Sequence, residues 1–435
     1  MELTRGKQLA ARLRQLVPGG CHTYAKGDDQ YPELAPALIA RGKGCHVWDL
    51  DGNQFIEYGL GLRAVTLGHA YPRVVDAVRG SLELGTNFTR PAPEELACAE
   101  AFLSLIDGAD MVKFTKDGSS AASAAVKLAR RHTGRDLVAI CAEHPFFSYD
   151  DWFICTTTSD GGIPRAIYEQ TVQFHYNDLA SLRAVFAAHP GAIAAVALEP
   201  ARIEEPAPGF LAELVALCHA EGALVIFDET ITGFRWHTRG AQGLYGVAPD
   251  MSVFGKGMAN GFSQSALAGK REVMHWGGRD RLDEDVFLLS TTHGVETPAV
   301  VAAIATMEVY RTEPVCEHLH RVGARLADGL RQASARHGLS AYVEPIGRAC
   351  NLFFSTRDPQ GKPSQPFRTL FLQELIRRGV LGPSFVVCYS HQDEDIDRTI
   401  DAVDGALGVY ARAMAQGNVD GLLVGPPSRP VFGRR

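Results

Sequence analysis

The chain has 435 residues, of which 46% are hydrophobic and 21% charged, a composition typical of globular proteins with a sizeable core. Its formal net charge is −7 without a run of like charges, so the charge pattern favours neither nucleic acid nor an anionic membrane surface as a partner. No apolar stretch reaches the roughly 18–20 residues that span a bilayer. This length predicts two or three domains.

The nine cysteines are scattered along the chain, at positions 21, 45, 98, 141, 155, 218, 316, 350 and 388. An odd number without a CxxC spacing argues against a disulfide framework and against a zinc site. We therefore expect reduced, mostly buried cysteines in a cytoplasmic protein. The first residues are too charged for a secretory signal, and they predict an amphipathic helix that ends at Pro18-Gly19-Gly20.

The middle of the chain alternates short apolar runs with helical patterns. In chain order, the sequence predicts a strand at 111–114, a helix at 120–132, strands at 137–141 and 192–200, a helix at 209–222 and a strand at 223–229. Continuous apolar strands separated by helices indicate an α/β fold, with a mostly parallel sheet that is covered by helices on both faces.

From about residue 307 onward the pattern changes. Long amphipathic helices are predicted at 315–338 and 393–414, with shorter strands between them, which is typical of a smaller α+β domain. We therefore predict a segment 1–68 that joins this small domain, a large α/β domain at 69–306, the small domain at 307–414 and an extended tail rich in Gly and Pro at 415–435.

Three short motifs in the large domain carry chemistry. The first is Asp228, which ends a fully apolar predicted strand. Ligands of open α/β sheets bind at the carboxyl ends of the strands. The carboxylate could cap the next turn, or it could face a cationic atom of a ligand.

The second motif is the turn Gly118-Ser119-Ser120, which lies between a predicted strand and a predicted helix. A turn of this kind presents free backbone N–H groups, two hydroxyls and the positive end of the helix dipole, so it could seat a phosphate. The alternative is plain capping of the helix by serine.

The third motif is Lys256, which stands between Gly255 and Gly257. Flanking glycines let a ligand approach the amine closely, and a lysine withdrawn from water becomes a nucleophile towards carbonyls. The alternative is a solvated lysine in a surface turn. A phosphate seat, a carboxylate at a strand end and an isolated amine are together the parts that hold pyridoxal 5'-phosphate.

These residues belong to a longer series of motifs, which includes "VIFDETITGFR" at 225–235, "PDMSVFGKGMANGF" at 249–262 and "ALAGKREVM" at 266–274. The series resembles the class III (fold type I) aminotransferases, nearest the branch that contains glutamate-1-semialdehyde 2,1-aminomutase. The resemblance covers nearly the whole chain. It implies the fold type I architecture, pyridoxal 5'-phosphate as the cofactor and a homodimer with shared active sites.

The resemblance also implies roles for single residues. Lys256 matches the lysine that forms the Schiff base, and Asp228 matches the partner of the pyridine nitrogen. Gly118 and Ser119 match the loop that binds the cofactor phosphate, and Phe146 matches the aromatic ring that stacks on the pyridine.

Further cofactor contacts are implied for Thr291 or Thr292, which match a threonine that reaches the phosphate of the neighbouring subunit. The chain departs from the family around the cofactor: Ser120 replaces an acidic residue, Phe147-Ser148 replace His-Gly, and Thr230 replaces a branched apolar residue that packs on the ring. It also departs in the late segment "LGPSFVVCYSHQDEDID", which is shorter than the aminomutase counterpart and lacks its glutamate. Glu199 and Glu229 are expected to support the local backbone.

Candidates for binding a substrate carboxylate or phosphate are Thr23 and Lys26, which stand nearest the serine and arginine of an early family motif. Arg63 and Arg235 are further candidates. Each of these side chains could equally be solvated or structural.

The predicted activity is transfer of an amino group between an amino donor, an amino acid or amine, and a small oxo acceptor. Intramolecular amine transfer, as in the aminomutase, and racemisation of an amino acid are the alternatives within the family. A hypothesis from another class of function is that the chain is a catalytically silent homologue that binds the cofactor or another phosphate ligand. A nicotinamide-dependent enzyme is disfavoured because no G-x-G-x-x-G motif follows the first strand.

Overall fold

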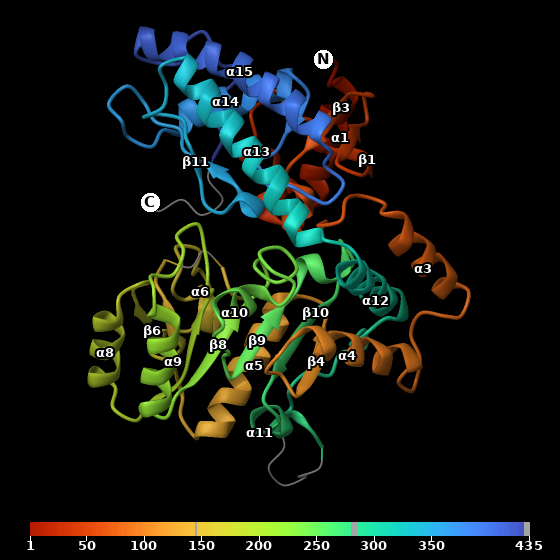
Figure 1. Ribbon diagram of the computed structural model, residues 1–435, viewed down its shortest axis with the longest axis vertical. Helices are drawn as coiled ribbons and strands as arrows, with labels where there is room; N and C mark the ends of the chain where they lie inside the picture. Colours follow the sequence, from red (N-terminus) through yellow and green to blue (C-terminus); the bar gives the residue numbers. More distant parts are fainter. Residues whose placement is uncertain (144–145, 280–285, 430–435) are drawn as a thin grey trace. The chain divides into compact units, whose positions relative to one another are not determined.

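The computed structural model describes residues 1–143, 146–279 and 286–429. The chain divides into two compact units (Figure 1). The central unit is Pro72–Cys316, and the terminal unit combines Met1–Tyr71 with the residues from Glu317 onward. None of the helices in the described ranges combines the length and the apolar character that a bilayer-spanning segment needs.

The central unit is built on a seven-stranded sheet. In spatial order its strands are β4 (Met111–Thr115), β10 (Ser265–Gly269), β9 (Met251–Phe254), β8 (Leu224–Asp228), β7 (Ile193–Leu198), β5 (Leu137–Cys141) and β6 (Thr171–Phe174). From β9 to β6 all neighbouring strands are parallel, whereas β10 runs antiparallel to both β4 and β9. The prediction of a mostly parallel sheet is confirmed.

Helices cover both faces of this sheet, because its strands are apolar on both sides. Alternate residues of β5 point in opposite directions: Val138 and Ile140 pack with α5 (Gly118–Thr133). Ala139 and Cys141 belong to the core on the other face, which is formed with α8 (Leu179–Ala188) and α9 (Phe210–Ala220). The predicted covering on both faces is therefore confirmed.

The remaining helices of the central unit lie around this sheet. They are α3 (Pro72–Leu82), α4 (Pro93–Leu105), α6 (Asp151–Ile154), α7 (Arg165–Tyr168), α10 (Gly240–Tyr245), α11 (Arg271–Met274) and α12 (Thr297–Thr312), with the 3-10 turns η4 (Lys256–Ala259) and η5 (His275–Gly277). Helix α12 packs against α3 and α4.

The terminal unit is an α+β structure formed by both ends of the chain. Its four-stranded sheet has the order β1 (Ile39–Lys43), β2 (His46–Asp49), β3 (Gln54–Glu57) and β13 (Val380–Leu381), and a second, two-stranded sheet pairs β11 (Pro345–Ile346) with β12 (Phe353–Phe354). Its helices are α1 (Thr4–Leu16), α2 (Leu60–Arg63), α13 (Val315–Arg336), α14 (Gln365–Arg377) and α15 (Asp393–Gln416), with short 3-10 turns at Pro18–Gly20, Tyr24–Lys26, Asp28–Gln30 and Ala349–Asn351.

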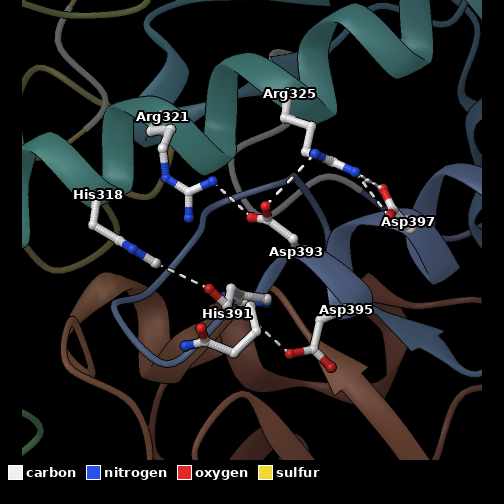
Figure 2. Close-up of polar contacts among 8 residues, drawn as sticks. His318, Arg321, Arg325, His391, Asp393, Asp395 and Asp397 are labelled. Atoms are coloured by element: carbon white, nitrogen blue, oxygen red, sulfur yellow. Dashed lines mark hydrogen bonds and ion pairs between the residues drawn. The ribbon is translucent and has the colours of Figure 1, made fainter.

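Ion pairs join two long helices of the terminal unit. Figure 2 shows Arg321 and Arg325 of α13 facing the first residues of α15. The Arg321 guanidinium lies 2.7 Å from Asp393, and Arg325 donates two hydrogen bonds to Asp397 from one nitrogen, of 2.7 and 2.8 Å. These arginines also place positive charge beside the acidic first turn of α15. Because the pairs are solvent-exposed, they contribute more to orientation than to stability.

Candidate active site

Three predicted residues meet at one edge of the central sheet. Asp228 is the last residue of β8, Gly118 begins α5 shortly after β4, and Lys256 comes two residues after the end of β9. Strands β4, β8 and β9 run in the same direction, since β10 is antiparallel to both of its neighbours. Their carboxyl ends therefore lie at the same edge, where ligands of such sheets bind.

The two glycines of this edge are packed tightly against polar side chains. A Cβ atom added to Gly118 would lie 3.1 Å from Thr230 Oγ1, and one added to Gly255 would lie 2.6 Å from Ser265 Oγ and 3.3 Å from Thr230 Cγ2. Thr230 is therefore in contact with both turns. Its hydroxyl oxygen is buried and has no hydrogen-bond partner among the described residues, which leaves it available to a ligand.

Lys256 adopts a backbone conformation that the sequence did not indicate. Its φ angle is +44°, in the left-handed region that non-glycine residues rarely occupy. The residue before it, Gly255, has φ −174° and ψ −150°, and the half-buried Lys256 opens the turn η4. Strained residues of this kind persist where the surrounding structure holds them, which is frequent at functional sites.

Asp228 is a buried carboxylate, with 7% of its surface exposed. Burial, reinforced by the nearby charge of Glu199, raises the pKa of Asp228 to about 6, although hydrogen bonding from Thr230 and the charge of Lys256 act in the opposite direction. The Thr230 backbone N–H donates to Asp228 Oδ1 over 2.9 Å. A cationic group next to this carboxylate would favour its ionised form.

Asp117, and not a serine, caps the start of α5. Its Oδ1 atom accepts the Ser120 backbone N–H over 2.8 Å, and the Ser120 hydroxyl donates to its Oδ2 atom over 3.2 Å. The alternative of capping by serine is therefore wrong, because the aspartate side chain already occupies this position. The N–H groups of Gly118 and of the buried Ser119 have no acceptor within the described ranges, and they lie at the positive end of a 16-residue helix.

Phe146 and the two threonines are open to solvent. Phe146 is 41% exposed and meets Phe153 edge-on, with 5.8 Å between ring centroids. Residues 144–145, just before it, lie outside the described part of the chain. Thr291 and Thr292 are exposed in the turn before α12, where the Thr291 carbonyl accepts the Gly294 N–H over 3.1 Å. The cofactor roles of these three residues stay predictions.

The four substrate candidates belong to different units. Thr23 and Lys26 are exposed in the terminal unit, where they line a cavity. Arg63, in the same unit, donates from Nε to Asn351 Oδ1 over 2.8 Å. Arg235 lies in the central unit and is only 1% exposed, so solvent does not reach it directly. Their roles in substrate binding stay predictions.

A left-handed turn in the terminal unit was also not indicated by the sequence. The four residues of α2, Leu60 to Arg63, have φ angles of 46°, 57°, 60° and 75°. Only Gly61 adopts such angles without steric cost, and the glycines at 59 and 61 are the only local signal for the turn. The turn places Leu62 in the wall of the same cavity as Thr23 and Lys26.

Glu229 holds the loop that follows β8. Its carboxylate accepts the backbone N–H groups of Ala241 and Gln242, over 2.7 and 2.8 Å. Burial is the main cause that raises the pKa of Glu229 to about 7. The prediction that Glu229 supports the local backbone is confirmed, because both of its oxygens are used by the start of α10.

Comparison with known proteins agrees with this architecture. The family model described as Aminotransferase class-III matches residues 27–407. Glutamate-1-semialdehyde 2,1-aminomutase of Desulfitobacterium hafniense is 32% identical over 426 residues, which cover 93% of this chain and 98% of the relative. The 3-aminobutyryl-CoA aminotransferase of Cloacimonas acidaminovorans is 30% identical over 417 residues, which cover 94% of this chain and 97% of the relative.

A solved structure is similar over the same extent. The FumI protein of Sphingopyxis sp. MTA144, in its PLP internal aldimine form, superposes with a TM-score of 0.87 and 29% identity, and the match covers 95% of this chain and 98% of that protein. Since a single family model covers most of the sequence and relatives align along almost their whole length, the chain belongs to the class III aminotransferases.

Proposed function

We propose that the chain transfers an amino group between an amine or amino acid and a small oxo compound, with its cofactor held at the edge of the central sheet. As a class III aminotransferase, the chain is an enzyme that depends on pyridoxal 5'-phosphate. Bound pyridoxal phosphate supplies an aldehyde that condenses with amines and a ring that accepts electrons.

The observation that carries this proposal is the group of residues at one sheet edge. Lys256, in its left-handed conformation, lies at the same edge as the buried Asp228. The free N–H groups of Gly118 and Ser119 and the unpartnered Thr230 hydroxyl lie there too. Hydrogen-bond donors at a helix start suit a phosphate, and a buried anion suits a protonated ring nitrogen. These residues therefore fit the cofactor.

Each residue then has a distinct task. The N–H groups of Gly118 and Ser119 would bind the phosphate oxygens, and Phe146 would stack on the ring. Asp228 would keep a proton on the ring nitrogen, since a cationic N–H beside it lowers the pKa of the carboxylate below the value of about 6 that it has in this structure. The Lys256 amine would bind the aldehyde carbon. Once a substrate amine has displaced it, the Lys256 amine would take the proton from the substrate carbon that bears nitrogen.

The test is chemical trapping of the lysine. Borohydride reduction followed by peptide mass mapping is expected to find the vitamin B6 adduct on Lys256 in the wild type and no adduct in Lys256→Ala. Lys270→Ala is the matched control, because Lys270 is in the same unit but pairs with Asp250 over 3.0 Å. An unmodified Lys256, or a Lys256→Ala variant with wild-type turnover, would contradict the proposal.

Intramolecular amine transfer is the second candidate. It is favoured by the 32% identity to a relative named as an aminomutase. Incubation of the holoenzyme with an amino-aldehyde, and with no separate amino acceptor, distinguishes the candidates. Isomerisation indicates a mutase, and conversion that needs a second oxo compound indicates a transferase. Inversion of a single enantiomer of an amino acid would instead indicate a racemase.

The homodimer is proposed on the resemblance, in which Thr291 or Thr292 reaches the phosphate bound by the other subunit. The exposure of both threonines in the turn before α12 supports this role. Co-expression of Lys256→Ala with a Thr291→Ala, Thr292→Ala double variant is expected to restore activity that neither has alone, because hybrid dimers regain one intact site. Cytoplasmic location is also proposed, and the nine free thiols are compatible with it.

A further inference from the structure

Three side chains of metal-ligating types lie together in the terminal unit, and the proposed function does not use them. Cys45, His46 and Asp395 each offer one ligand atom, and these atoms all lie within 4.8 Å of one another. All three residues belong to the same compact unit, although Cys45 and Asp395 are 350 positions apart in the sequence. A ligand set assembled by the fold in this way has no CxxC spacing, so the lack of that spacing in the sequence does not argue against it.

The separations between the ligand atoms suit a tetrahedral metal ion. Cys45 Sγ lies 3.2 Å from Asp395 Oδ2 and 3.5 Å from His46 Nδ1, and His46 Nε2 lies 3.3 Å from Asp395 Oδ1. Bonds of about 2.0–2.3 Å from zinc to oxygen, nitrogen and sulfur place tetrahedral ligand atoms about 3.3–3.6 Å apart. The three side chains therefore need little rearrangement to hold such an ion, with one imidazole nitrogen as the third ligand atom.

The carboxylate of this cluster is buried without a strong cationic partner. Asp395 is 9% exposed, and in the described part of the chain the only basic side chain paired with it is the His46 imidazole. The nearby arginines of α13 pair with other carboxylates of α15 (Figure 2). Buried charges are generally paired with an opposite charge or coordinate a metal ion. The cluster thus carries a negative charge that a divalent cation would offset.

The backbone holds the three side chains in this arrangement. Cys45 lies in the turn between β1 and β2, and its carbonyl accepts the Glu57 N–H over 2.8 Å. Neighbouring side chains within a strand point to opposite faces, but Cys45 precedes the strand, so its sulfur can lie beside the His46 ring. The Gln392 N–H donates to Asp395 Oδ2 over 3.1 Å at the start of α15. Ligands that are already oriented lose less freedom when an ion binds.

An ion can reach this cluster from solvent because two of its side chains are partly exposed. The His46 side chain is 22% exposed and that of Asp395 is 12% exposed, whereas Cys45 is buried. The alternative is a hydrogen-bonded network without an ion, in which the Cys45 thiol and the His46 ring donate to the carboxylate. The two interpretations differ in a measurable way, since only a ligand set binds one metal ion per chain.

We propose that Cys45, His46 and Asp395 bind a divalent transition-metal ion of the zinc type. Thiolate and imidazole ligands favour zinc, whereas magnesium and calcium prefer oxygen ligands. Cys45 binds as a thiolate and releases its proton to solvent, and a water molecule completes the fourth position. The ion joins the turn between β1 and β2 to the start of α15. It therefore stabilises the terminal unit and takes no part in the proposed amino transfer.

Cobalt(II) is the probe, because four-coordinate Co²⁺ with a thiolate ligand has strong visible absorption bands at longer wavelengths than the bound cofactor. Holoenzyme that is treated with a chelator and then titrated with Co²⁺ is expected to develop these bands with one equivalent per chain, and excess Zn²⁺ is expected to abolish them. Cys45→Ser, His46→Gln and Asp395→Asn should each weaken Co²⁺ binding at least about tenfold, since loss of a ligand costs no less than loss of an outer-shell partner.

Controls separate the cluster from metal binding by other groups of the same unit. Cys21→Ser removes a more exposed thiol, and His337→Gln removes a histidine whose Nε2 atom lies 3.3 Å from Asp404. Both variants are expected to bind Co²⁺ like the wild type. Asp395→Asn keeps an oxygen that can cap the start of α15, so it tests the site even if Cys45→Ser does not fold. Zn²⁺ should raise the Tm of the wild type and leave the Tm of the ligand variants unchanged.

Two results would overturn the inference. If no Co²⁺ bands develop with one equivalent, the cluster is a hydrogen-bonded network only. If the bands are weak, as for six-coordinate Co²⁺, and persist in all three ligand variants, the cobalt is an adventitious ion only. The proposed function fails separately, because the Lys256 adduct is expected after borohydride reduction whether or not the protein has been treated with a chelator.

Discussion

The strain at Lys256 leads to a prediction that compares two variants without the lysine amine. Both Lys256→Gly and Lys256→Ala remove the amine, but only glycine adopts the φ angle of +44° without steric cost. A left-handed conformation costs a non-glycine residue about 1–2 kcal/mol. Glycine loses more chain entropy on folding, which costs about 0.5–1 kcal/mol relative to alanine. The balance makes the glycine variant about 1 kcal/mol more stable than the alanine variant.

Thermal unfolding of the cofactor-free proteins measures this difference. For units of this size, about 1 kcal/mol corresponds to a Tm that is about 2–4 °C higher for Lys256→Gly. The same pair of substitutions at Lys270 is the control, since Lys270 has φ −65°. There the alanine variant is expected to be the more stable one, by about 0.5–1 kcal/mol.

An alanine variant at position 256 that is as stable as the glycine variant, or more stable, would refute the reasoning. It would mean that the backbone of Lys256 relaxes once the amine is removed, and that the left-handed conformation depends on the side chain. The difference in Tm between the glycine and alanine variants of Lys270 shows whether the assay resolves effects of this size.

Three further predictions concern the site and its surroundings. The pKa of Asp228 is raised from its ordinary 3.8 to about 6, so its contribution to stability is complete below pH 3.8 and is lost as the pH rises through 6. In urea unfolding without cofactor, the free energy of unfolding of Asp228→Asn should therefore exceed that of the wild type by about 3 kcal/mol near pH 8, and by much less near pH 4. A difference in stability that does not depend on pH would contradict this cause. Gly255→Ala places a Cβ atom 2.6 Å from Ser265 Oγ and should lower the free energy of unfolding by about 1–3 kcal/mol. Adding Ser265→Gly should recover most of the lost Tm, and no recovery would show that the clash is relieved elsewhere. Arg325→Gln removes an exposed pair with Asp397, so its Tm should match that of the wild type at high salt, and a large drop there would show that the pair is not screened.

The parallel part of the sheet could be predicted from the sequence because its strands are continuous apolar runs. The predicted strand 137–141 has the same bounds as β5, and α15 begins at Asp393 as predicted. β10 could not be predicted in this way. Its residues, Ser265–Gly269, are small and have no strong preference for a strand, and their strand conformation comes from pairing with β4 and β9.

The candidate site was predictable in its residues but not in its conformations. Lys256 and Asp228 are recognisable because flanking glycines and the end of an apolar strand are local features. The left-handed angle of Lys256 depends on the turn between β9 and β10, which the sequence did not predict. Capping of α5 by Asp117 was missed because the serines after Gly118 offered an equally good local explanation.

The pairing of β3 with β13 has a consequence for recombining this chain with relatives. Every residue predicted to hold the cofactor lies in one uninterrupted stretch, 72–316, whereas the cavity wall is assembled from both chain ends. Because Ile56 pairs with Val380, a chimaera that exchanges only one end joins strands of different parents within a single sheet. Grafting both ends together around an unchanged middle is the crossover design that this pairing favours, and it leaves the central unit around Lys256 from a single parent.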